Sequence, residues 1–293
     1  MKHHPPNNLA SYYVPHQSAW PILGALALLI LAFASLNLTE KWGFAALLLG
    51  LCILLFMLGG WLWSVTKESN AGLYNQQMDR TFRWGMLWFL VSELFLFGLL
   101  LGSIVHVRFS ITPWLAGESG AASMLTHYLL WPDFSQHWPL TVPPADSPPT
   151  TATYLDIAMK GLPFFNVILL MLSTLVVVTS KFFLKKGQYQ RSFMILNVAI
   201  FCGILFLGLQ IYYGLRLIAV HIILKTGIYG SLLIALLGLH IINILAALLC
   251  LIGASVRLHH QKLTNSNTFL LDAGIWWWIF LTGIWLIGVF LIF

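Results

Sequence analysis

The chain has 293 residues, of which 59% are hydrophobic and 8% are charged, whereas about 25% of the residues in a soluble domain are charged. So few charged side chains exclude a water-soluble fold of this size and indicate a protein whose apolar side chains face lipid as well as one another. The formal net charge of +6 predicts no nucleic-acid partner, because the basic residues are spread between apolar segments and form no patch on a folded face.

Seven apolar segments each approach the roughly 20 residues that a membrane-spanning helix needs. A spanning strand needs only about 9–11 residues and alternates in polarity, so the lengths favour helices. We therefore predict one all-α, polytopic membrane domain over residues 1–293. Its helices are expected at about 21–38, 43–65, 85–105, 162–180, 193–213, 229–256 and 270–293.

A proline-rich segment separates the third and fourth predicted helices. It contains Trp131-Pro132, Trp138-Pro139 and four prolines within residues 143–149. Because proline interrupts regular helix, this segment is predicted to be a loop outside the membrane. The apolar stretch 217–224 is too short to span, and we expect an interfacial segment or a helical extension there.

Basic residues predict the orientation, because loops on the cytoplasmic side carry more Lys and Arg. Ten of the fifteen lie on one side of the predicted topology and five on the other. The larger group comprises Lys2, Lys67, Arg80, Arg83, Lys181, Lys185, Lys186, Arg191, Arg257 and Lys262, and the smaller Lys41, Arg108, Lys160, Arg216 and Lys225. The N-terminus is therefore predicted in the cytoplasm and the C-terminus outside.

Few side chains in the apolar segments are able to bind a metal. Cys52, Cys202 and Cys250 are far apart and form no C-x-x-C pair, so they predict buried hydrophobic side chains and neither disulfides nor a dithiolate site. Of the ten histidines only His240 is clearly at membrane depth, whereas a haem or copper site needs several imidazoles or thiolates. We predict no catalytic residue, no metal site and no redox centre in this chain itself.

Glu93 is the one acidic residue well inside a predicted helix, where a charge is costly. Two roles remain open from the residues alone: a proton-responsive carboxyl group, or a protonated, hydrogen-bonded group that joins helices. Glu93 lies ten residues after Arg83, about 15 Å along the helix and near mid-bilayer. His240 lies at similar depth and is one candidate partner. For His240 itself, an interhelical hydrogen bond is favoured over a proton-responsive role.

The run Trp276-Trp277-Trp278 is predicted to anchor the start of the last helix at the membrane interface, with stacking on a cofactor as the alternative.

Nine motifs in order along nearly the whole chain resemble subunit III of the haem–copper cytochrome c oxidases. The strongest is residues 83–93, which match R-x-G-M-x-x-F-x-x-S-E without a gap and include the family's intramembrane glutamate at Glu93. The others lie at 20–25, 67–69, 138–139, 163–166, Gln210, 229–231 with 238–240, Arg257, and 272–278 with Trp285. With this resemblance we take Glu68, Arg83, Arg257, Trp276 and Trp278 as candidates for binding lipid or a partner.

The chain also departs from the family pattern. Asn243 stands at the family's second histidine, and Ile279 and Thr282 stand at a histidine and an aspartate. Lys181-Phe182 replaces a His-His pair, and the terminal Y-W-W-G is absent. These losses weaken any prediction of a proton-collecting histidine surface, whereas Glu93 is retained.

The resemblance implies a non-catalytic subunit of a proton-pumping oxidase that reduces oxygen to water. In the family, helices one and two diverge from helices three to seven, and the V-shaped cleft between them holds phospholipid. The subunit flanks subunit I, which carries haem and copper, in a complex that also contains subunit II, and it supports proton uptake and the stability of subunit I. A bacterial inner membrane, or an equivalent energy-transducing membrane, is the implied location.

Two alternative functions remain. A related subunit of a quinol oxidase or a nitric-oxide-reductase accessory protein often lacks the first two helices, and both are predicted here, so the cytochrome c branch is favoured. A transporter would show inverted repeats with broken helices in matching positions, and no such repeat is visible.

The predicted topology is tested by reporter fusions. A reporter placed near Gly187 is expected to be active in the cytoplasm, and one near Pro143 outside it, because the basic residues distribute that way. The opposite pattern would mean that a helix has been miscounted.

Overall fold

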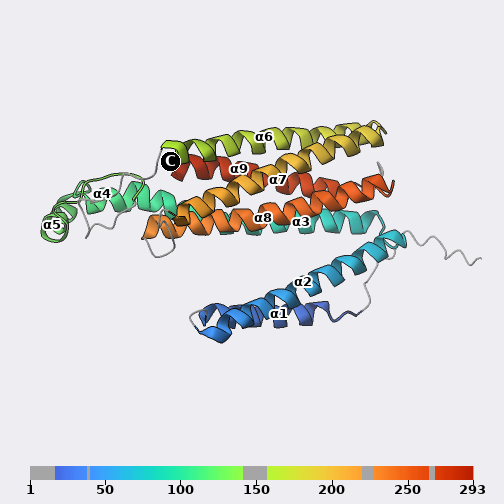
Figure 1. Cartoon of the computed structure of the whole chain (residues 1–293), viewed down its shortest axis with the longest axis horizontal. Coiled ribbons are helices and arrows are strands. Elements are labelled where there is room, and N and C mark those ends of the chain that lie inside the picture. Colours follow the sequence, from blue (N-terminus) through green and yellow to red (C-terminus); the bar gives the residue numbers. More distant parts are fainter. Residues whose placement is uncertain (1–16, 38–39, 141–156, 220–226, 264–267, 293) are drawn as a thin grey trace, which may run out of the picture. The chain divides into compact units, whose positions relative to one another are not determined.

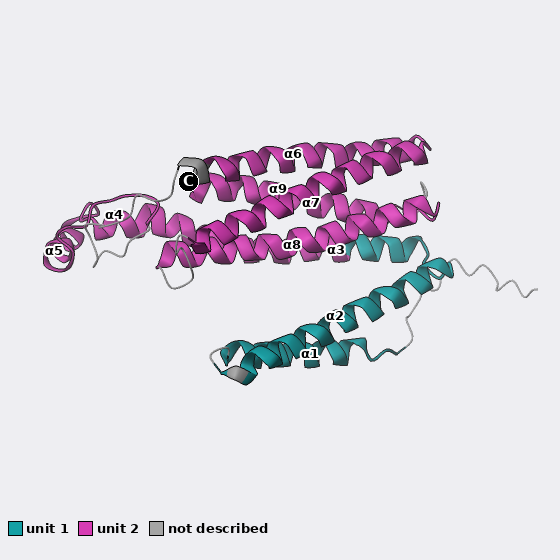
Figure 2. Ribbon diagram, in the orientation of Figure 1, with its two compact units in different colours: residues 1–84 teal, residues 85–293 magenta. Residues whose placement is uncertain are grey.

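The computed structural model describes residues 17–37, 40–140, 157–219, 227–263 and 268–292, and within these ranges its regular elements are all helical. The chain forms two compact units, Met1–Trp84 and Gly85–Phe293 (Figure 2). Helix α3, Gln76–His106, runs across the boundary between them. Each unit is described by itself below.

The first unit is an antiparallel pair of helices, α1 (Trp20–Leu36) and α2 (Lys41–Asn70), which pack along each other (Figure 1). Small residues permit the close approach: the ring of Trp20 lies directly over Gly60, and Gly50 faces Leu31. The indole nitrogen of Trp20 also donates a hydrogen bond to the Ser64 hydroxyl at 3.2 Å. Close backbone approach at small residues is how helices associate in lipid, where no hydrophobic force drives them together.

The second unit is a bundle of antiparallel helices around one apolar core (Figure 1). Its long helices are α6 (Ile157–Lys185), α7 (Tyr189–Ala219), α8 (Ile228–His259) and α9 (Phe269–Ile292), together with most of α3. Neighbours in sequence pack on one another, and α6 also packs on α9. Helix α3 joins the core through Phe97, whose ring lies 6.0 Å from that of Phe280.

Six of the described helices are long and apolar enough to cross a membrane. The outward faces of the bundle carry large apolar side chains, such as Leu99, Phe201 and Ile242, each at least 66% exposed. This arrangement fits lipid as the solvent and confirms the prediction of an all-helical polytopic membrane protein. Helix α1 has only 17 residues, about 25 Å against a hydrocarbon core of about 30 Å. The seventh span and the V-shaped arrangement therefore stay predictions.

The segment after α3 is more helical than predicted. Helix α3 continues through a π-helical turn, η1 (Val107–Ile111), into α4 (Thr112–Leu115), and a further helix, α5 (Ala121–Leu130), follows. The prediction of a loop over this whole segment was wrong, because the prolines that disfavour helix come later. Helix α5 ends just before Trp131-Pro132, where the residue preceding proline avoids the helical region.

The described residues include only part of the other segments predicted to lie between the spanning helices. The proline-rich residues 143–149 lie outside the described residues. Helix α7 extends to Ala219, so the first part of the apolar stretch 217–224 is a helical extension, and residues 220–224 lie outside the described ranges.

Gly203 is predicted to be essential for packing in the second unit. A Cβ at this position of α7 would lie 2.6 Å from Trp278 and 2.8 Å from Leu248, whereas one at Gly208 of the same helix would meet nothing within 4 Å. We expect Gly203→Ala to lower the free energy of unfolding by about 1–3 kcal/mol through overpacking. Thermal unfolding in detergent would measure it, with Gly208→Ala as the control. Equal stability of the two variants would contradict the described α7–α9 packing.

Candidate functional site: a polar network between α3, α8 and α9

Glu93 is hydrogen-bonded to two further helices through Asn243. The Asn243 side-chain nitrogen donates to Glu93 Oε2 at 3.0 Å, and the indole nitrogen of Trp277 donates to Asn243 Oδ1 at 3.0 Å. The Trp277 ring also packs edge-on against Phe89, with 4.8 Å between ring centroids. A chain of hydrogen bonds thus connects α3, α8 and α9.

The direction of this network follows from its donors. An indole N–H only donates, so it fixes the Asn243 oxygen towards Trp277 and turns the amide NH₂ towards Glu93. The second amide N–H is satisfied by the Leu239 carbonyl of the same helix at 3.2 Å. Glu93 is therefore held as an acceptor. Within the described residues it makes no ion pair, so its environment is built from uncharged groups.

The expected partner of Glu93 was wrong. His240 lies instead between Gln210 and the Leu281 carbonyl, at 2.9 Å from Gln210 Nε2 and 3.1 Å from the carbonyl oxygen. The neutral tautomer with hydrogen on Nε2 satisfies both contacts, since a carbonyl only accepts. The imidazole is fully buried and stacks on Trp285, with 4.8 Å between centroids. His240 thus makes the interhelical hydrogen bond that was favoured for it.

An ion pair joins α6 and α9 at the end where α6 ends and α9 begins. The carboxylate of Asp272, 2% exposed, lies 2.6 Å from Lys181 Nζ and also accepts a hydrogen bond from Thr268 Oγ1 at 2.8 Å. A buried carboxylate needs such partners. Asp272 and Lys181 were noted separately in the sequence, but their pairing was missed. The signal was their predicted position on the same side of the membrane.

The opposite end of α9 is capped by side chains. The guanidinium of Arg108 donates to the Leu291 carbonyl at 2.9 Å, and the indole nitrogen of Trp138 donates to the Ile292 carbonyl at 2.9 Å. The guanidinium also lies 5.4 Å from the Trp138 ring centroid. Terminal helix carbonyls have no partner within their own helix, and these two side chains supply one.

The candidates for binding lipid or a partner are distributed over both units. In the first unit, Glu68 accepts a hydrogen bond from the Tyr74 hydroxyl at 2.8 Å, and Arg83 pairs with Asp79 one turn earlier in its helix at 2.7 Å. In the second unit, Arg257 is half-buried in the last turn of α8. These three residues remain candidates.

The tryptophan run of α9 is partly buried within the second unit. Helix α9 begins at Phe269, so the run starts seven residues, or about 10 Å, inside the helix. Trp276 is half-buried and remains a candidate, whereas Trp278 is fully buried against Gly203. A surface role for Trp278 was therefore wrong, whereas the anchoring of the helix at the membrane interface stays a prediction.

Two departures from the family pattern also have a place in the structure. Thr282 of α9 shares a 2.7 Å hydrogen bond with Thr174 of α6. Ile279 is exposed on the outer face of α9. Among the described residues, no three His, Cys, Asp or Glu side chains lie together as a metal site would need.

Comparison with known proteins identifies the family. A sequence model of cytochrome c oxidase subunit III matches residues 10–122 and 144–293. This chain belongs to the cytochrome c oxidase subunit III family. The matched ranges include Glu93, Asn243 and Trp277, whereas Trp138-Pro139 lies in the unmatched residues between them.

Relatives in this family are distant but cover the chain. Cytochrome c oxidase subunit 3 of Latimeria chalumnae is 26% identical over 279 residues, or 94% of each chain. The protein of the same name from Osphranter robustus is 25% identical over the same shares, and that of Lycodon semicarinatus is 24% identical over 96% of this chain and 95% of its own. Similarity therefore extends through both units of this subunit III family member.

The polar network predicts that Asn243 contributes to stability. Asn243→Leu leaves the Glu93 acceptor and the Trp277 donor without their shared partner, and we expect a loss of about 1–3 kcal/mol in the free energy of unfolding. Ser92→Ala is the control, since the Ser92 hydroxyl bonds only to the Phe89 carbonyl of its own helix. Chemical unfolding of both variants would measure the difference. A Leu variant as stable as the Ala control would rule out a stabilising network.

Proposed function

We propose that this chain is the non-catalytic subunit III of an aerobic respiratory cytochrome c oxidase, which transfers electrons from cytochrome c to oxygen and pumps protons. The observation that carries the proposal is the family match along nearly the whole chain. In this role the chain supports proton uptake and the stability of subunit I, which it contacts directly, with subunit II in the same complex. Haem and copper belong to the partner subunits.

The contacts of the polar side chains in the second unit are consistent with a non-catalytic role. Two polar pairs join helices of the second unit: Glu93 with Asn243, and His240 with Gln210. Such groups fix helices in place and leave no ligand set for a redox metal among the described residues. We expect the chemistry on oxygen to belong to another chain, and phospholipid to be the ligand of this one.

The proposed location is a bacterial inner membrane or an equivalent energy-transducing membrane. The chain would cross it seven times, with α1 as the first span, the N-terminus in the cytoplasm and the C-terminus outside. Support comes from the six long apolar helices and from the excess of basic residues on the predicted cytoplasmic side.

The cytochrome c branch is favoured over a quinol oxidase or a nitric-oxide-reductase accessory protein. Subunits of those complexes often lack the first two helices. Here the family match begins at residue 10 and so covers both α1 and α2, which form a packed pair.

Affinity purification from native membranes tests this proposal. A tag on this chain is expected to bring down a complex with haem and copper absorbance and cytochrome c oxidase activity. The same full-length chain expressed alone is expected to show neither absorbance. Purification with a quinol-oxidising complex would replace the proposal by its closest alternative, and stoichiometric metal in the isolated, folded chain would overturn the non-catalytic role.

A further inference from the structure

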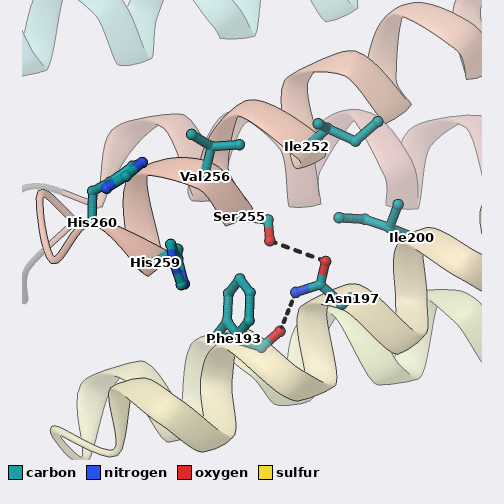
Figure 3. A pocket seen from close by; sticks show the side chains of 8 residues that line it. All are labelled: Phe193, Asn197, Ile200, Ile252, Ser255, Val256, His259 and His260. Carbon is teal, nitrogen blue, oxygen red and sulfur yellow. Dashed lines mark hydrogen bonds between the residues drawn. The ribbon is translucent and has the colours of Figure 1, made fainter.

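A cavity of about 300 Å³ lies in the groove between α7 and α8, at the end where α7 begins and α8 ends (Figure 3). The residues that line it change from aliphatic to aromatic and polar along the helix axes. The deep part is formed by Ile200 and Ile252, and the outer part by Phe193, His259 and His260. From Ile252 to His260 the wall extends about 12 Å along α8, so one cavity joins an apolar interior to a pair of imidazoles.

Polar atoms are present at an intermediate depth of this cavity. Asn197 Nδ2 donates to the Phe193 carbonyl at 2.8 Å, and Asn197 Oδ1 accepts from the Ser255 hydroxyl at 3.2 Å (Figure 3). The side chain is nevertheless exposed, although it lies about 12 Å from the start of α7. An amide carries two N–H donors, so one has no acceptor within the described residues. Hydrocarbon chains offer none, whereas the ester carbonyl of a phospholipid does.

The imidazoles lie about one helical turn farther out than Ser255, or 5–6 Å. The His259 ring packs near Phe193, with 5.2 Å between centroids, and near His260, with 5.3 Å. Both histidines are exposed, and neither imidazole has a hydrogen-bond partner among the described residues. The spacing is that of a glycerol unit, which separates the phosphate of a phospholipid from its ester carbonyls.

The charge at this end favours an anion. Arg191 lies in the first turn of α7 and Arg257 in the last turn of α8, and Lys262 follows two residues after His260. Among the described residues of this unit, Asp272 is the one carboxylate at this end, and it is paired with Lys181. A phosphate at the imidazoles would therefore meet positive charge and little repulsion.

We propose that the α7–α8 groove binds one anionic glycerophospholipid. Its phosphate accepts hydrogen bonds from His259 and His260, one ester carbonyl accepts from Asn197, and an acyl chain lies against Ile200 and Ile252. This inference specifies the lipid binding within the proposed function. It rests on insertion in a membrane and not on the oxidase role of the complex.

Photolabelling tests the site in the assembled complex. The complex is reconstituted in phosphatidylcholine vesicles that contain a small fraction of photoactivatable phosphatidylglycerol, and labelled peptides are mapped. Label is expected on residues 193–200 and 252–260 and is expected to fall when unlabelled phosphatidylglycerol competes. The double variant His259→Leu with His260→Leu removes both donors and is expected to reduce this label at least about tenfold, since one hydrogen bond to a charged group contributes roughly that factor.

Two further variants keep the test specific. His106→Leu makes the same change at an exposed histidine at the opposite end of this unit and is expected to leave the label unchanged. Val256→Trp fills the groove while keeping both imidazoles and is expected to abolish the label. Unchanged labelling in the double histidine variant or in Val256→Trp would overturn the proposal. So would a structure of the complex in which a partner subunit fills the groove.

Oxygen consumption and the haem spectrum are measured on the same preparations. Loss of label with both retained supports the lipid site independently of the oxidase role. A preparation without haem that still shows the competed label would refute the proposed function and leave the lipid site standing.

Discussion

Hydrocarbon offers no hydrogen-bond partner, and this constraint accounts for the contacts that Asn243 and His240 make in the second unit. Asn243 uses both amide hydrogens and its oxygen, on Glu93, Leu239 and Trp277. His240 uses both ring nitrogens, on Gln210 and Leu281. At one end of α9, Arg108 and Trp138 supply the donors that its last carbonyls lack. Apart from the Asn243–Leu239 contact within α8, these contacts join elements distant in sequence, so satisfying these polar groups also fixes how the helices pack.

Helix packing also depends on size complementarity between facing side chains. In the first unit Trp20 lies over Gly60, and in the second Trp278 lies over Gly203. Both pairs place the largest side chain against the smallest, which brings the backbones close and gains dispersion contacts that lipid would not replace. The glycines are therefore part of the interface, and the outward apolar side chains remain available for lipid or partner subunits.

The sequence predicted the helices well because length and apolarity alone decide them. Each predicted range lies largely on an observed helix, and the observed ends extend into polar residues, as where α2 continues through Lys67 to Asn70. The rotation of each helix about its own axis could not be predicted from the sequence. Glu93 and His240 lie at similar depth, but only the facing of α3, α8 and α9 determines that Asn243, rather than His240, meets Glu93.

Two other features were not predicted from the sequence for the same reason, because the facing of the helices was unknown. A tryptophan run suggests an interface by composition, yet the burial of Trp278 depends on Gly203, 75 positions away in sequence. The pairing of Asp272 with Lys181 required the contact between α6 and α9. Conversely, the family motif around Glu93 located the central polar residue without any structure, because an acidic residue inside an apolar segment is conspicuous.

Proton pumping by an assembled complex carrying Glu93→Gln tests the central claim most directly. The claim is that Glu93 acts as a hydrogen-bond acceptor for Asn243, and a Gln carbonyl keeps that acceptor while removing the titratable proton. Assembly, turnover and protons pumped per electron are expected to stay near the wild-type values, whereas Glu93→Ala is expected to weaken assembly. A Gln variant that assembles normally but pumps fewer protons, or pumps with a changed pH dependence, would contradict the account.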